Sequence, residues 1–377
     1  MLELFRRMVN HCLNIGIAHN VASLKKLSLL CYHELEQYRC YSSYKICAIS
    51  RSAGILAARR KSLKRGYPSR NPYALKPYLT CCYGFKIEGN LLRIPRGNKA
   101  YWKIHLVPHT LTVVSEPTTR VRSFTITASK LTLCVSREVP EIECNDTMGI
   151  DRNLHNLTSG NQHRVVQYDI SDTVRIAETT ARIVRSFRRN DWRILEKIGA
   201  KYGRRRRNRI QQLIHNVTKR IVCEALEHRQ ALVLENIEGI RRLYRRGNGQ
   251  GQRYRRKMNG WRFGEAQRQI EYKARWAGLP FIRLSRKETR GTSVTCPQCG
   301  ERLQEDDQFR RRLWCRQCSA LMDRDVVAVI NLSQRGRLRF DRSRAQYGLE
   351  GGAVEEMRGN PTPTVILRVD ASKSAIS

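Results

Sequence analysis

The chain has 377 residues, of which 41% are hydrophobic, so it can bury the cores of two or three modest domains. Lysine and arginine number 71 against 33 acidic residues, and the net charge of +38 predicts a polyanionic partner such as nucleic acid. A ribosomal or membrane-surface protein could share this charge, but the arginines are spread over most of the chain rather than along one amphipathic helix.

The chain shows neither a run of about 18 apolar residues nor a signal peptide, so we expect no membrane contact and a cytoplasmic, reducing location. The 13 cysteines should then be thiols or metal ligands rather than disulfides. Nine of them have no ligand-like spacing and are expected to be buried as small apolar residues: Cys12, Cys31, Cys40, Cys47, Cys81, Cys82, Cys134, Cys144 and Cys223.

Residues 1–66 carry apolar side chains at helical spacing and predict three helices. Residues 67–146 begin with a Gly/Pro-rich linker and continue with short β-rich segments, including a hairpin turn at Gly89-Asn90 and a strand at TLTVVS (110–115). This region predicts a small β-barrel or sandwich.

From residue 147 strands alternate with helices, as in an α/β domain. We expect strands at TMGID, at ALVLEN (231–236) and at LPFIRLS, and helices over 171–189, 191–229 and 260–277. The basic, glycine-rich segment 241–257 is expected to be a mobile loop, and residues 336–377 a poorly ordered tail.

Two C-x-x-C pairs lie in the segment 293–320. Cys296 and Cys299 form the first pair and Cys315 and Cys318 the second, a spacing typical of a zinc ribbon. Gly300 follows the first pair, where the turn needs a residue that tolerates positive φ. Four thiolates leave no open coordination position, so the sequence predicts one structural zinc ion.

Three acidic residues stand at the ends of expected elements. Asp151 ends the strand in GID, Glu235 ends the strand in ALVLE, and Asp325 begins the helix in MDRDVVAVINL. Taken singly, each has an ordinary explanation as a turn residue, a loop cap or, for Asp323 or Asp325, a helix N-cap. Hydrolysis of a phosphodiester by two metal ions needs carboxylates that hold the ions about 3.5–4 Å apart. The order of the acids, with the cysteine pairs before the third, favours a nuclease site.

The segment from Glu271 to Leu332 resembles TnpB, the OrfB-type proteins of bacterial and archaeal insertion sequences. EYKARWAGLPFIRL, TSVTCPQCG, WCRQC and DRDVVAVINL carry this resemblance, and GIDRNLHNLTSG and LVLENIEGI match the earlier nuclease motifs. It covers roughly residues 1–335 and is strongest after residue 148.

The resemblance implies a transposon-associated, RNA-guided DNA endonuclease of a type once described as transposases. Its partners would be target DNA and a guide RNA from the transposon end, and it would act in the prokaryotic cytoplasm, at the nucleoid when bound. Asp151, Glu235 and Asp325 match the family's D…E…D acids, which hold two Mg²⁺ or Mn²⁺ ions. Asp325 is preferred over Asp323 because it aligns with the acid of the D-x-N-A-A-x-N-I pattern.

The expected fold class is α+β and multidomain. It comprises a helical recognition-like insert (1–66), a wedge-like β-barrel (67–146), an RNase H-like (RuvC) α/β domain in two parts (147–292 and 321–335), the inserted zinc ribbon (293–320) and the tail (336–377).

Several features depart from the family pattern. Val327 stands where Asn is usual and Val329 where a second Ala is common. Family members open with a β-strand, whereas Met1 already lies inside the first expected helix. The missing strand fits a truncated gene product or a misplaced start. It leaves open a catalytically inactive relative that acts as a zinc-containing nucleic-acid-binding protein. A generic zinc-ribbon RNA-binding protein would not need acids at strand ends in this order.

Arginine-rich segments are expected to bind nucleic-acid backbones, because arginine grips phosphates with two hydrogen bonds and almost no acids interrupt these runs. A solvated charged face is the alternative. Tyr244 and Tyr254 could stack on bases. The candidates are Arg204, Arg205, Arg206, Arg207, Arg241, Arg242, Arg245, Arg246, Arg253, Arg255 and Arg256.

Overall fold

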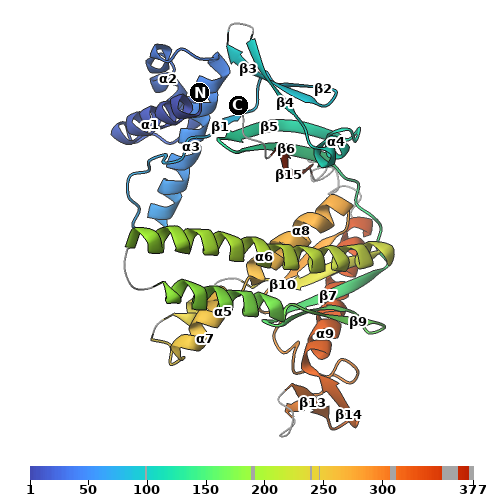
Figure 1. Ribbon diagram of the computed structural model, residues 1–377. Helices are drawn as coiled ribbons and strands as arrows, with labels where there is room; N and C mark the ends of the chain where they lie inside the picture. The colour runs from blue at the N-terminus through green and yellow to red at the C-terminus, as the bar shows by residue number, and fades with distance from the viewer. Residues whose placement is uncertain are drawn as a thin grey trace. The chain divides into compact units, whose positions relative to one another are not determined.

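The computed structural model describes residues 1–97, 100–187, 192–237, 240–245, 247–305, 311–349 and 364–372 (Figure 1). It divides into two compact units, one of residues Met1–Glu138 with Thr364–Ser377 and one of residues Val139–Pro363. Among the helices described, none is long and apolar enough to cross a membrane.

The first unit opens with the expected helices, α1 (Leu2–Ala18), α2 (Leu24–Cys31), the short 3-10 helix η1 (Glu34–Gln37) and α3 (Ser42–Lys64). They pack on one another through buried apolar side chains. Phe5 and Met8 of α1 and Tyr44 of α3 are fully buried. The Ser52 hydroxyl of α3 donates a hydrogen bond to the Val9 carbonyl at 3.0 Å, which fixes α3 against α1.

The strands of the first unit form two open sheets. β1 (Leu79–Cys81), β5 (Thr119–Thr127), β6 (Lys130–Glu138) and β15 (Thr364–Ser372) make an antiparallel sheet in the order β1-β5-β6-β15. β2 (Lys86–Glu88), β3 (Leu91–Gly97) and β4 (Ala100–His105) make the second, with the predicted hairpin turn between β2 and β3. The predicted barrel is therefore not closed, because the described strands pair within two separate sheets, each with its own edges.

The predicted strand at TLTVVS was wrong, because this segment lies in helix α4 (Pro108–Val114). Pro108 occupies the first turn, where a missing backbone N–H breaks no helical hydrogen bond and the fixed φ favours helix. Thr110 is fully buried, so packing outweighs the β-propensity of its neighbours.

The second unit is built on a five-stranded sheet in the order β11-β10-β7-β8-β9. β7 (Asp146–Arg152) lies at its centre, parallel to β10 (Gln230–Glu235) and antiparallel to β8 (Asn156–Gly160). β11 (Phe281–Leu284) pairs in parallel with β10, and β9 (Val165–Asp169) is antiparallel to β8. The strands predicted at TMGID, ALVLEN and LPFIRLS are confirmed as β7, β10 and β11, whereas β8 and β9 were not predicted.

Helices cover both faces of this sheet. Met148 and Ile150 of β7 and Leu232 and Leu234 of β10 pack into one core with α6 (Trp192–Glu227) and α8 (Phe263–Ala277). Val233, between them in β10, packs on the opposite face with Leu332 of α9 (Arg324–Leu349). The alternation of side chains along each strand therefore produces a three-layer α/β/α arrangement.

The segment 241–257, expected to be a mobile loop, contains the 3-10 helix η2 (Ile240–Tyr244) and most of helix α7 (Gln252–Gly260). Gly247 and Gly249 adopt positive φ in the turn between them. The stretch QRYRRKM has no glycine or proline and is rich in arginine and lysine, which favour helix. With α5 (Ser171–Ser186), these helices lie on the α6 side of the unit (Figure 1).

The sequence predicted a poorly ordered tail from residue 336, whereas the structure continues α9 to Leu349 and places β15 beside β6. Gly336 packs against Val233, Phe340 packs on the main core, and the Arg337 guanidinium pairs with Asp146 at 3.2 Å. These contacts attach the C-terminal half of α9 to the second unit, although its polar composition predicts a poorly ordered tail. Residues 350–363 and 373–377 lie outside the described part.

Candidate functional site

The three predicted acids line one cleft. A cavity of about 640 Å³ in the second unit, called the acid cleft below, has Asp151, Glu235 and Asp325 in its wall. Asp151 and Glu235 stand at the ends of the parallel neighbours β7 and β10, where the pairing of Ile150 with Leu234 makes them adjacent. Asp325 lies in the first turn of α9, which packs across β7. The fold thus unites residues from three distant parts of the chain.

Asp151 is held in a defined orientation. Its Oδ1 accepts a hydrogen bond from the Arg152 backbone N–H at 2.9 Å, and its Oδ2 accepts one from the Asn153 amide at 2.7 Å. Burial and the charge of Asp325 raise the pKa of this carboxyl to about 6, although those two hydrogen bonds oppose the shift; the charge of Glu235 adds to it. Burial is the main cause of the raised pKa, and repulsion from the other two acids of the cleft adds to it.

Arg152 lies behind the acid cleft and connects the elements that carry its residues. Its guanidinium, which is buried, donates hydrogen bonds to the backbone carbonyl of Glu235 and to the Gln267 side chain, the latter at 2.7 Å. Burial lowers its pKa to about 10, against the raising effect of the Glu235 and Asp151 charges. Arg152 therefore links the ends of β7, β10 and α8.

Asp325 and Asp323 have different roles in the structure. Asp323 accepts hydrogen bonds from the backbone N–H groups of Asp325 at 2.8 Å and Val326 at 3.3 Å, so it caps α9. The Asp325 side chain lines the acid cleft and is only 3% exposed. It accepts a hydrogen bond from the Asn156 amide at 3.0 Å and pairs with the Arg311 guanidinium. The geometry agrees with the choice of Asp325 as the cleft residue.

The residues of the acid cleft fit a divalent cation. Carboxylate and amide oxygens are the ligands that Mg²⁺ prefers, and a cation between the acids would relieve the repulsion that raises the pKa of Asp151. The buried Oδ1 of Asn156 has no hydrogen-bond partner among the described residues. Asn156 lines the same cleft, and this oxygen could bind a water molecule of a hydrated ion. Sequence reasoning did not select Asn153 and Asn156, although both lie within the matched stretch GIDRNLHNLTSG, and it did not select Arg311, which lies in no quoted motif.

The four cysteines predicted as ligands converge. Their sulfur atoms all lie within 4.8 Å of one another, and this group could hold a metal ion such as zinc. They stand around a small sheet of β12 (Gln304–Glu305), β13 (Arg312–Cys315) and β14 (Ala320–Asp323). Gly300 has φ of +78°, as the turn after the first pair requires.

The surroundings of Cys296 favour its thiolate form. Burial opposes the thiolate, but the backbone N–H groups of Cys299 and Gln298 outweigh that effect and lower the pKa of Cys296 to about 7. Because zinc binds the thiolate form, this environment favours a metal ligand. Cys296 and Cys315 are buried together with Val327 of α9, so the ribbon shares its small core with the helix that carries Asp325.

The expectation that the other nine cysteines are buried was wrong for Cys82 and Cys223, which are exposed. Cys47 lies 3.6 Å from Cys81 and 4.0 Å from Cys82, measured between sulfur atoms. Sequence spacing could not show this proximity, because Cys47 lies in α3 and the other two lie at the end of β1.

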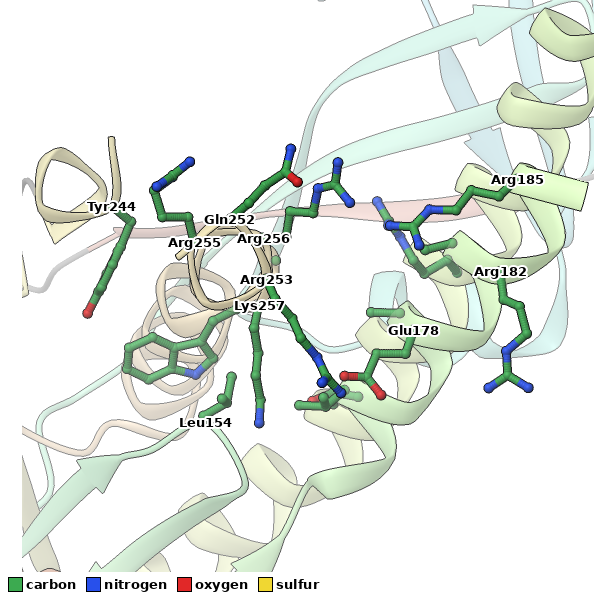
Figure 2. A pocket seen from close by; sticks show the side chains of 17 residues that line it. Leu154, Glu178, Arg182, Arg185, Tyr244, Gln252, Arg253, Arg255, Arg256 and Lys257 are labelled. Carbon is green, nitrogen blue, oxygen red and sulfur yellow. The ribbon is translucent and has the colours of Figure 1, made fainter. Parts of the chain in front are cut away.

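Some of the predicted nucleic-acid contacts line a cavity, and others do not. A second cavity of about 1070 Å³, called the basic pocket below, lies among α5, α6 and α7 (Figure 2). Arg206, Arg253, Arg255 and Arg256 line it, together with residues that the sequence analysis did not select, Arg182, Arg185, Lys257 and Trp261. Arg204, Arg205, Arg207 and Arg245 are exposed and line neither cavity. Arg241 and Arg242 lie in η2, and Arg246 lies outside the described residues.

The comparisons with known proteins agree with this geometry. The family model described as Cas12f1-like, TNB domain, matches residues 263–332. The cryo-EM structure of a Cas12f1-sgRNA-target DNA complex shares the fold, with a TM-score of 0.57 and 14% identity over 88% of this chain and 80% of that one. The TnpB-like protein MJ0751 of Methanocaldococcus jannaschii is 31% identical over 201 residues, which are 50% of this chain and 69% of that protein. The chain therefore belongs to the TnpB-like family.

Proposed function

We propose that the chain is an RNA-guided DNA endonuclease whose second unit is a RuvC-like, RNase H-like domain. Asp151, Glu235 and Asp325 would hold two divalent cations, Mg²⁺ or Mn²⁺. The observation that carries this proposal is the acid cleft itself. Three carboxylates from separate segments share it at a cost in mutual repulsion, which is unusual for residues that serve only structure and common at catalytic sites.

Guide RNA and target DNA are the proposed partners. The net charge of +38 requires extensive neutralisation by polyanions, and the solved complex that shares this fold contains both kinds of nucleic acid. In such complexes base pairing with the guide reads the sequence, while the protein binds backbones.

The bound ions would activate a water molecule and stabilise the leaving oxygen of the cleaved phosphodiester. The residues of this chain position the ligands. Asn153 and the Arg152 backbone orient the Asp151 carboxylate, and Asn156 orients Asp325. Arg152 also fixes the Glu235 backbone, so that the ends of β7 and β10 keep one spacing.

We further propose that Cys296, Cys299, Cys315 and Cys318 hold one zinc ion. Four thiolates complete a tetrahedral shell, so this ion would stabilise the ribbon and take no part in hydrolysis.

Cleavage of a matched DNA target by the chain with its guide RNA tests the nuclease proposal. Asp325→Ala should abolish cleavage and leave nucleic-acid binding nearly unchanged, because binding depends on the basic surfaces. Asp323→Ala is the matched control. It removes a helix cap worth about 1 kcal/mol and should retain most of the activity.

The outcomes separate the alternatives. Cleavage that survives in Asp325→Ala but disappears in Asp323→Ala would show that Asp323, and not Asp325, is the third catalytic acid. A parent chain that binds guide and target but never cleaves would instead support the inactive, nucleic-acid-binding relative.

A further inference from the structure

Three cysteines of the first unit lie together, outside both candidate sites. Cys47 belongs to α3, Cys81 is the last residue of β1, and Cys82 follows it. The sulfur of Cys47 lies 3.6 Å from that of Cys81 and 4.0 Å from that of Cys82. α3 and β1 pack side by side within this unit, so its own fold brings the three thiols together (Figure 1).

The hydrogen bonds of the cluster make Cys81 its strongest nucleophile. Its sulfur accepts a hydrogen bond from the Cys47 thiol and another from the Tyr83 backbone N–H, the latter at 3.4 Å. The bond from Cys47 is the main cause of a lowered pKa at Cys81, which burial opposes and the Tyr83 N–H supports. Because the thiolate is the form that attacks another sulfur, Cys81 is suited to react with its neighbour Cys47.

The three thiols differ in their access to solvent. Cys81 is buried, Cys47 is half-buried and Cys82 is exposed. A small oxidant therefore meets Cys82 first. Burial, together with the charge of Cys47, raises the pKa of Cys82, so only a small part of this thiol is ionised at neutral pH. The cluster would respond to sustained rather than brief exposure.

We propose that Cys47, Cys81 and Cys82 form a hydroperoxide-sensitive site, at which oxidation enters through Cys82 and ends as a disulfide between Cys47 and Cys81. Disulfides in a reducing compartment usually form transiently in response to oxidants, and closely spaced thiols at different depths suit that role. The site does not depend on the proposed nuclease function.

The electrons and atoms of this oxidation balance. The Cys82 thiolate attacks one oxygen of the peroxide, which breaks the O–O bond and yields a sulfenic acid and a hydroxide that becomes water. The Cys47 thiol attacks the sulfenic sulfur, so that an S–S bond forms, the S–O bond breaks and a second water leaves. The Cys81 thiolate then attacks Cys47 and displaces Cys82, which recovers a proton. Two thiols are oxidised and one peroxide is reduced to two waters.

The final disulfide would fasten α3 to β1, the end strand of its sheet. The connecting segment is already held by hydrogen bonds, since the Ala74 N–H donates to the Asn10 side chain at 2.7 Å. Cys47 and Cys81 are 34 residues apart, and closing a loop of this size restricts the unfolded chain. Oxidation should therefore raise the midpoint of thermal unfolding of the first unit by about 10 °C.

The test treats the full chain, with zinc supplied for the ribbon, with hydrogen peroxide. The remaining thiols are alkylated, and disulfides are mapped by mass spectrometry before and after dithiothreitol. The parent chain should lose two free thiols as a reducible Cys47–Cys81 disulfide. Cys81→Ser should stop at a Cys47–Cys82 disulfide. Cys47→Ser should form neither, and dimedone should trap the sulfenic acid at Cys82. Cys223→Ser, which removes an exposed thiol of α6, is the control and should behave as the parent does.

Mapping of the parent needs no substitution, so a variant that folds poorly cannot hide the answer. Cys47 that stays free to alkylation, or a disulfide between Cys81 and Cys82, would overturn the proposal. Oxidation confined to the ribbon cysteines would overturn it as well. Cys82→Ser should delay the Cys47–Cys81 disulfide, and an unchanged rate would refute entry through Cys82. The rise in the unfolding midpoint should appear in the parent and be lost in Cys47→Ser.

Discussion

Replacing Asp151 with asparagine should stabilise the folded second unit at neutral pH. A carboxyl whose pKa is higher in the folded than in the unfolded chain favours folding while it is protonated. That contribution is complete below the ordinary pKa of 3.8 and is lost as the pH rises through about 6. At neutral pH the ionised carboxylate therefore destabilises the fold.

The pKa values set the size of the effect. Raising the pKa of Asp151 from 3.8 to about 6 corresponds to about 3 kcal/mol at most. Asparagine removes the charge but turns one acceptor into a donor, which costs about 1 kcal/mol at the hydrogen bond from Asn153. The net gain for Asp151→Asn is thus about 2 kcal/mol at neutral pH, and it becomes a loss of about 1 kcal/mol near pH 4, where the parent carboxyl is protonated.

Denaturant unfolding in buffer without Mg²⁺, with zinc supplied for the ribbon, measures this difference at the two pH values. Adding Mg²⁺ should then stabilise the parent and have little effect on Asp151→Asn, because ligand binding stabilises only the state that holds it. Asp323→Asn is the control, since asparagine caps a helix as well as aspartate does. A variant less stable than the parent by the same amount at both pH values would refute the electrostatic reasoning.

Three further changes test other parts of the structure. Cys315→Ser should reduce zinc from one ion per chain to none, measured by metal analysis, while the exposed Cys223→Ser keeps the ion; full occupancy in Cys315→Ser would contradict the ligand assignment. Gly149→Ala should lower the free energy of unfolding by about 3 kcal/mol, because its Cβ would collide with the Val329 carbonyl and the Ser333 amide. Gly199→Ala in α6 is the control, since its Cβ meets free space and should raise the free energy of unfolding by up to about 1 kcal/mol. Similar unfolding midpoints for the two variants would argue against close packing of α9 on β7. Arg152→Met should cost about 3 kcal/mol by leaving the Glu235 carbonyl and Gln267 without their buried donor, and a neutral result in the same assay would remove its bracing role.

The residues that gather at the two candidate sites could be predicted from the sequence better than the shape of the sites. The cysteine spacing and the order of Asp151, Glu235 and Asp325 identified residues that the structure then brings together, because strand ends and paired C-x-x-C turns leave strong local patterns. Asn156 lies within the matched stretch GIDRNLHNLTSG, but its contact with Asp325 leaves no such pattern. It reaches Asp325 only because β8 folds back along β7.

Non-local packing explains what the sequence did not reveal. α4 forms where β-propensity predicts a strand, because Pro108 starts a helix and Thr110 is buried in it. β15 pairs with β6 across more than 200 residues of intervening chain, a contact that no local pattern reports. The basic pocket draws Arg182 and Arg206 from helices whose contact cannot be deduced from either alone, so the conspicuous run of arginines in α6 contributes only one side chain to it.

The position of Val327 gives the ribbon an influence beyond its own fold. This side chain is buried among the ribbon cysteines, while Leu332, farther along the same helix, is wedged against β10 and β11. The first turn of α9, which carries Asp325, is thus supported both by the ribbon core and by the central sheet. Loss of a zinc ion from the ribbon would remove the support at Val327 and loosen the position of Asp325, although no ribbon ligand lines the acid cleft. A chelated chain would then stay inactive when Mg²⁺ alone is returned and would recover only with zinc, so one protein would show two metal requirements of different origin.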